Sequence, residues 1–149
     1  MFTDALLAYA HFFALLSAYA LLAVELVCFT WSVPGRWRRL ARIDIGFFVS
    51  AIALLLTGLG RVFYGLKGAA YYWHDLWFHA LWITYLLIGL TSIVPTLAFI
   101  RWAKQEQAAP GFVPGPQELR RVHNCLKLEI VLFSLAPVFA VLMARGYGA

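Results

Sequence analysis

Charged residues are scarce in this sequence. Only 13% of its 149 residues are charged, whereas 63% are hydrophobic. A soluble domain of this size is usually about half apolar and about a quarter charged. The shortage of charge excludes a separate soluble domain and favours one membrane domain over residues 1–149.

The sequence also lacks the motifs of common enzymes. It contains no phosphate-binding loop, dinucleotide fingerprint, nucleophile–base signature or paired metal motif. Its two cysteines, Cys28 and Cys125, form no metal-type pair, and we interpret them as small buried apolar residues. The net charge of +5 does not indicate nucleic-acid binding, because the basic residues flank apolar stretches. Any enzymatic chemistry is therefore expected from a bound cofactor, and the sequence does not decide whether the protein is an enzyme.

Four apolar stretches are long enough to cross a bilayer, which takes about 20 mostly apolar residues per helix. They run roughly over residues 5–31, 43–63, 76–100 and 126–143. The first has no preceding Lys or Arg and exceeds the apolar region of a signal peptide, so we expect it to stay in the mature protein. The segment Gln117–Arg121 is predicted to begin a short interfacial helix. The sequence predicts an all-α, integral membrane four-helix bundle.

Lys and Arg are unevenly distributed between the two ends of the spans. Under the positive-inside rule, the distribution predicts two cytoplasmic basic loops and both termini outside. Trp31, Trp37 and Trp102 are expected in an aromatic girdle at the inner face. Nine basic residues belong to the first and third loops and three to the opposite side: Arg36, Arg38, Arg39, Arg42, Arg101, Lys104, Arg120, Arg121 and Lys127, against Arg61, Lys67 and Arg145.

Polar residues of the first span share one face. Asp4, His11 and Glu25 follow a seven-residue spacing, with Ala18 at the remaining position. Successive members drift by only about 20°, so the face is expected to point into the bundle, away from lipid. Close helix packing and hydrogen bonding between helices are the structural alternative to a functional role.

Histidines mark an outer polar layer. His11 and His79 lie at similar depth on different spans, and two such residues can bind one metal centre in a bundle. His74 and Asp75 could add ligands, which leaves zinc or copper open. Haem is a further possibility, since it needs only one or two axial imidazoles and an apolar slot. The structural alternative is that each histidine is a hydrogen-bonded core residue. The aromatic residues available for the slot are Phe12, Phe13, Trp77, Phe78 and Trp82.

Two basic residues, Arg61 and Lys67, belong to the same outer layer. Arg61 follows Thr57 by four residues and hence lies on its face. Its guanidinium could hold a haem propionate, a quinone headgroup or a lipid phosphate. The alternative is an interfacial arginine paired with Asp75.

Carboxylates mark an inner polar layer. Glu25 and Glu129 lie at similar depth, and Asp44 opens the second span nearby. They could form a proton path, but a salt-bridge network closing the cytoplasmic end is the favoured interpretation. The candidate basic partners of this network are Arg42, His123 and Lys127.

Four segments carry a family resemblance: His11 before a long apolar helix, Thr57–Gly68, Leu90–Thr96 and Met143–Gly148. The second has Gly58, Arg61, Phe63, Tyr64, Lys67 and Gly68 in a G-x-x-R-x-F-Y-x-x-K-G pattern. These segments resemble an uncharacterised bacterial family of predicted membrane proteins, domain-of-unknown-function family 2214. The resemblance implies a four-helix multi-pass protein, expected in the bacterial cytoplasmic (inner) membrane, with no established activity.

The layout is more distantly similar to haem-binding four-helix membrane proteins. These include the bacterial membrane protoporphyrinogen oxidase, b-type cytochromes and copper-resistance membrane domains. The similarity rests on His11 and on the run Trp77–Ala80. The oxidase family has a lysine soon after this run, where the present chain has Leu81 and Trp82, so the resemblance supports a haem-binding bundle rather than the oxidase activity.

The leading hypothesis is a b-type haem-binding protein with a redox or porphyrin-related role. His11 is the first axial ligand expected and His79 the second, with Arg61 or Lys67 holding carboxylates. The first alternative is a non-enzymatic accessory or assembly subunit that packs against other membrane subunits or its own copies in the lipid bilayer. The second is a small metal-handling or transport protein, which the absence of an internal repeat pair disfavours.

Overall fold

Helices make up nearly all of the structure. The computed structural model describes residues 2–65 and 68–147. The helices are α1 (Phe2–Thr30), α2 (Arg36–Tyr64), α3 (Ala69–His74), α4 (Leu76–Ala108) and α5 (Pro116–Ala144). Each of α1, α2, α4 and α5 is long and apolar enough to cross a membrane, which confirms the predicted four-helix, all-α architecture.

Three of the long helices, α2, α4 and α5, extend beyond the predicted apolar spans at the ends that carry the basic loops. α4 continues through Lys104 and Glu106 to Ala108, because these residues favour helix although they are polar. It ends shortly before Pro110, which cannot continue a helix. α5 begins with Pro116 at its first turn, so the segment predicted as a separate interfacial helix is the start of α5.

The short helix α3 was not predicted. It lies between Gly68 and Asp75, in what the sequence suggests is a loop. Asp75 ends it and starts α4: its Oδ1 accepts hydrogen bonds from the backbone N–H groups of Trp77 at 2.8 Å and Phe78 at 3.4 Å. Six residues are too few for a hydrophobic periodicity to be visible in the sequence.

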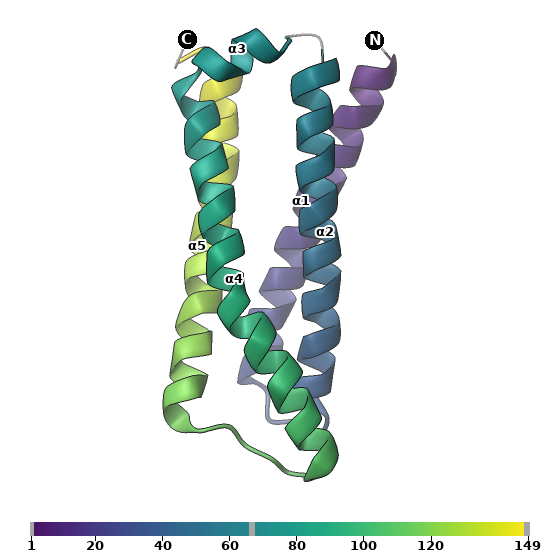
Figure 1. Cartoon of the computed structure of the whole chain (residues 1–149), viewed down its shortest axis with the longest axis vertical. Helices are drawn as coiled ribbons and strands as arrows, with labels where there is room; N and C mark the ends of the chain where they lie inside the picture. The colour runs from purple at the N-terminus through teal and green to yellow at the C-terminus, as the bar shows by residue number, and fades with distance from the viewer. Residues whose placement is uncertain (1, 66–67, 148–149) are drawn as a thin grey trace.

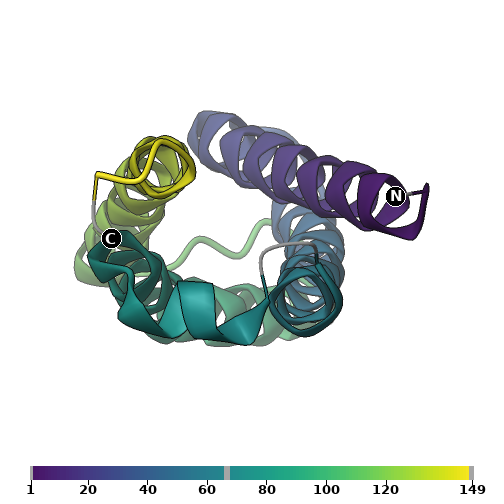
Figure 2. The same cartoon turned by 90° about the horizontal axis from the view of Figure 1, so that it is seen from above.

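The four long helices form two antiparallel hairpins, α1–α2 and α4–α5. α2 contacts α4, and α1 contacts α5. Both termini and α3 lie at one end, called here the α3 end (Figure 1). The connections 31–35 and 109–115 lie at the other, called here the basic end. Figure 2 shows α3 running from α2 to α4 across the α3 end.

α4 changes direction along its length and joins the two hairpins at the basic end. It lies beside α5 at the α3 end and crosses toward α2 at the basic end (Figure 1). Pro95 lies inside α4 and provides the physical reason for a bend, since it lacks an N–H and removes one helix hydrogen bond.

Buried aromatic rings close the basic end. The ring centroids of Trp37 and Trp102 are 4.7 Å apart, and Phe29 packs against both. Trp37 and Trp102 are 1% and 0% exposed, so they are not members of a lipid-facing girdle as expected. Sequence spacing gives the depth of a tryptophan but not the direction of its side chain. Trp31, by contrast, is 56% exposed.

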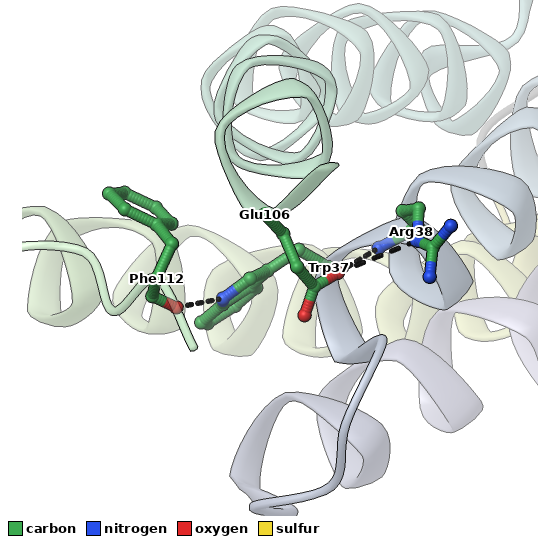
Figure 3. A network of polar contacts seen from close by, with 4 residues as sticks. All are labelled: Trp37, Arg38, Glu106 and Phe112. Carbon is green, nitrogen blue, oxygen red and sulfur yellow. Dashed lines mark hydrogen bonds and ion pairs between the residues drawn. The ribbon is translucent and has the colours of Figure 1, made fainter. Parts of the chain in front are cut away.

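Polar contacts hold the connection 109–115 to this aromatic cluster. The indole N–H of Trp37 donates to the carbonyl of Phe112 at 3.2 Å (Figure 3). Beside it, Arg38 Nε lies 4.0 Å from Glu106 Oε2, which links α2 to the end of α4 (Figure 3). The Arg38 side chain is 55% exposed, and ion pairs near the surface contribute about 0–1 kcal/mol each, so the buried rings are the larger stabilising element.

The middle of the bundle depends on small residues of α1. Ala18 is 0% exposed, whereas Ala20, two residues later, is exposed. We expect Ala18→Leu to lower the unfolding free energy by about 1–3 kcal/mol, because a larger side chain does not fit the packed interior. Thermal unfolding in detergent measures the effect. Ala20→Leu is the matched control and should leave the midpoint unchanged; equal midpoints for the two variants would contradict the packing described.

Candidate functional site

His11 is held by a threonine of the neighbouring helix. Its Nδ1 lies 3.1 Å from Oγ1 of Thr57 on α2. The Thr57 hydroxyl donates its single hydrogen to backbone carbonyls, Ala53 O at 2.7 Å and Leu54 O at 3.1 Å. Oγ1 is therefore an acceptor toward His11, and we assign the Nδ1–H tautomer to the neutral imidazole. Nε2 then carries a lone pair.

A glycine gives the imidazole room against α2. A Cβ atom at Gly58 would lie 3.2 Å from His11 Cε1, tighter than ordinary packing allows. Gly58 therefore lets the ring approach α2 closely and reach Thr57. Within residues 2–65 and 68–147, His11 Nε2 makes no hydrogen bond, so this nitrogen is free to bind a ligand.

His11 lies on the wall of a cavity of about 370 Å³ between the two hairpins. The cavity lies toward the α3 end and receives residues from all five described helices. Its wall is almost entirely apolar, and six of the lining residues are aromatic: Phe12, Tyr72, Phe78, Trp82, Tyr85 and Phe133. A volume in this range is typical of sites for small molecules and cofactors.

Arg61 lines the same cavity. Its Nε is buried and has no hydrogen-bond partner among the described residues. The guanidinium carbon lies 6.0 Å from the ring centroid of Phe12. The alternative pairing with Asp75 is not present in the described structure, since Asp75 Oδ1 caps α4 and its Oδ2 is buried without a partner. A buried donor without an acceptor suits an anionic ligand group.

The other predicted histidine ligands of the α3 end do not line this cavity. His79 is exposed, and its Nε2 lies 3.1 Å from the backbone oxygen of Trp73. His74 is exposed at the end of α3 and does not line the cavity. Lys67 lies outside the described residues. No group of three His, Cys, Asp or Glu in residues 2–65 and 68–147 is arranged to hold a metal ion.

The aromatic slot differs in part from the predicted one. Phe12, Phe78 and Trp82 line the cavity as expected. Phe13 is 62% exposed, and Trp77 stacks on Phe139 with ring centroids 5.7 Å apart. α5 contributes a further wall of the cavity, which the sequence did not predict. The residues of this wall include Ala136, Pro137 and Ala140, and they form no distinctive pattern in the sequence.

The three predicted carboxylates of the inner layer come together near the basic end. Glu25, Asp44 and Glu129 belong to α1, α2 and α5, are 1%, 4% and 1% exposed, and interact electrostatically. The Thr96 hydroxyl donates to Asp44 Oδ1 at 3.0 Å. Among the described residues, Glu25 Oε1 and Glu129 Oε1 have no partner.

The predicted basic partners are not paired with these carboxylates. No ion pair in the described part of the chain joins Arg42 or Lys127 to Glu25, Asp44 or Glu129. His123 instead stacks on Phe29, with ring centroids 5.5 Å apart. The favoured interpretation of a salt-bridge network therefore has no counterpart in the described contacts.

A layer of apolar side chains separates the carboxylates from the cavity. One turn from each carboxylate toward the α3 end lies a buried apolar residue: Leu22 on α1, Phe47 on α2 and Phe133 on α5. The rings of Phe47 and Phe133 are 6.0 Å apart. The two polar layers inferred from the sequence are thus distinct sites.

Comparison with known proteins assigns the chain to a family. Residues 3–148 match the family described as predicted membrane protein (DUF2214). The chain belongs to the DUF2214 family. This confirms the predicted family and its membrane character, and the DUF2214 description specifies no ligand or reaction. No curated protein and no solved structure matches the chain.

The tautomer of His11 is directly testable. In protein labelled with ¹⁵N-histidine, we expect NMR to show His11 protonated at Nδ1 and unprotonated at Nε2. Thr57→Val removes the acceptor and should produce a mixture of tautomers. Thr91→Val is the control, because the Thr91 hydroxyl bonds only to Leu87 O on its own helix. A wild-type signal from the Nε2–H tautomer would refute the assignment.

Proposed function

We propose that the cavity at the α3 end binds haem b or a related porphyrin, with His11 as the axial ligand to the iron. The observation that carries the proposal is a free imidazole Nε2 on the wall of an apolar, aromatic cavity inside a membrane bundle. Haem sites have this composition: an imidazole for the iron and apolar side chains for the macrocycle.

The residues around the cavity fit such a group. Thr57 fixes the orientation of His11 through Nδ1, as the outer-shell partners of ligating histidines generally do. Arg61 supplies a buried donor for a propionate carboxylate. When bound, haem would supply one-electron chemistry. Of the two predicted histidine ligands, only His11 lines the cavity, so we propose a single protein ligand and omit His79.

Haemin titration in detergent tests the proposal. We expect purified protein to bind haemin and to give a visible spectrum whose reduced band depends on an imidazole ligand. His11→Ala should abolish or shift this band, because it removes the ligand to iron. His79→Ala, an exposed histidine away from the cavity, should leave the spectrum unchanged.

Two results would overturn the proposal. One is a colourless protein that takes up no added haemin. The other is a haemin complex whose spectrum does not respond to His11→Ala. Iron-free protoporphyrin serves as a further control for the cavity itself, since its binding needs the apolar wall and Arg61 but not the imidazole ligand.

We also propose that the basic end faces the cytoplasm of a bacterial cell and that both termini face the periplasm. The proposal is supported by the concentration of Arg and Lys in the helix ends that flank the connections 31–35 and 109–115. In this orientation the cavity lies in the outer half of the cytoplasmic membrane, close to the periplasm.

Cysteine labelling in intact bacterial cells tests this orientation. After Cys28→Ala and Cys125→Ala, single cysteines are introduced by Ala70→Cys in α3 or Gln107→Cys near the end of α4, both at exposed positions. We expect a membrane-impermeant maleimide to label position 70 in intact cells and position 107 only after permeabilisation. The reverse pattern would contradict the proposed orientation.

A further inference from the structure

We propose that the buried carboxyl cluster of Glu25, Asp44 and Glu129 is a proton-binding site, in which Glu25 and Glu129 are protonated at neutral pH and Asp44 carries the negative charge. This site is separate from the proposed haem cavity. The inference does not depend on whether a cofactor binds there.

Burial is the first reason. Glu25 and Glu129 are each 1% exposed and Asp44 is 4% exposed, within helices that are long enough to span a membrane. An ionised side chain at the centre of a membrane helix costs about 2.5–3.5 kcal/mol or more. Three carboxylates close enough to interact would add mutual repulsion to that cost.

The lack of a counter-ion is the second reason. Across the described ranges, 2–65 and 68–147, no Lys, Arg or His forms an ion pair with any of the three carboxyl groups. The described residues also contain no arrangement of three metal-ligating side chains. Because neither a basic side chain nor a metal site neutralises the cluster, protons are the remaining means of reducing its charge.

The hydrogen bonds distinguish the three groups from one another. Asp44 receives a hydrogen bond from the Thr96 hydroxyl at 3.0 Å, and a donor of this kind stabilises a carboxylate. Glu25 Oε1 and Glu129 Oε1 are buried without any described partner. Burying a neutral carboxyl group without a partner costs much less free energy than burying an ionised one. The negative charge is therefore assigned to Asp44 and the protons to the two glutamates.

The surroundings of the cluster separate it from the cavity at the α3 end. Leu22, Phe47 and Phe133 cover it toward the α3 end. Toward the basic end, Cys125 lies one turn before Glu129 on α5 and interacts electrostatically with both Glu129 and Arg121. The cluster therefore lies on the basic-end side of this apolar layer, apart from the cavity lined by His11.

Infrared spectroscopy tests this inference on haem-free protein. Purified protein in a detergent without carbonyl groups should show, at neutral pH, the C=O band of protonated carboxylic acids, shifted to lower frequency in D₂O. Glu25→Gln and Glu129→Gln should each remove one component of the band, and the double variant should remove all of it. Glutamine has nearly the same shape as a protonated glutamate, so we expect these variants to fold.

Two matched variants separate the cluster from other carboxyl groups. Asp44→Asn should not remove the band, because Asp44 is assigned as ionised and the burial of Glu25 and Glu129 still favours their neutral form. Glu118→Gln should leave the band unchanged, since Glu118 is half exposed and paired with Arg101 at 2.6 Å. A wild-type spectrum without the band overturns the proposal, whether or not the variants fold. A band that survives the double variant, or that disappears with Asp44→Asn alone, overturns it as well.

Discussion

The packing of Phe29 against Trp37 and Trp102 is the interaction on which the arrangement of the four long helices depends. Phe29 lies in the last turn of α1, Trp37 in the first turn of α2, and Trp102 near the end of α4. All three rings are buried, with centroids 4.7 to 6.4 Å apart. Because large rings from both hairpins interlock here, the hairpins are fixed at the basic end. Toward the α3 end the cavity separates them.

The difference in packing between the basic end and the α3 end explains why the two polar layers have different surroundings. Near the closed end, Glu25, Asp44 and Glu129 are packed among apolar side chains and are almost completely buried. At the open end, His11 and Arg61 face a cavity and keep unused hydrogen-bonding capacity toward it. Leu22, Phe47 and Phe133 lie between the layers. One bundle thus contains a closed polar site and an open one, and the residues described between them form an apolar layer rather than a polar path.

The sequence predicts the depth of each side chain much better than its direction. Hydropathy and helix length locate the four spans, and the seven-residue spacing correctly puts His11 and Glu25 on the inward face of α1. His79 lies at the expected depth, but α4 turns its side chain toward Trp73 and the surface. The partner is supplied by α3, and the position of that short helix is not encoded in local spacing.

The partner of His11 shows what tertiary structure adds to a sequence pattern. Thr57 is notable in the sequence only for its position four residues before Arg61. In the fold, the close approach of α1 to α2 at Gly58 makes Thr57 the residue that holds the imidazole. The α1–α2 hairpin alone therefore fixes the position of His11, whereas α4 and α5 provide the opposite wall of the cavity. A ligand that fills the cavity and contacts His11 must touch both hairpins, so its binding free energy would also hold them together at the end where their own packing is incomplete.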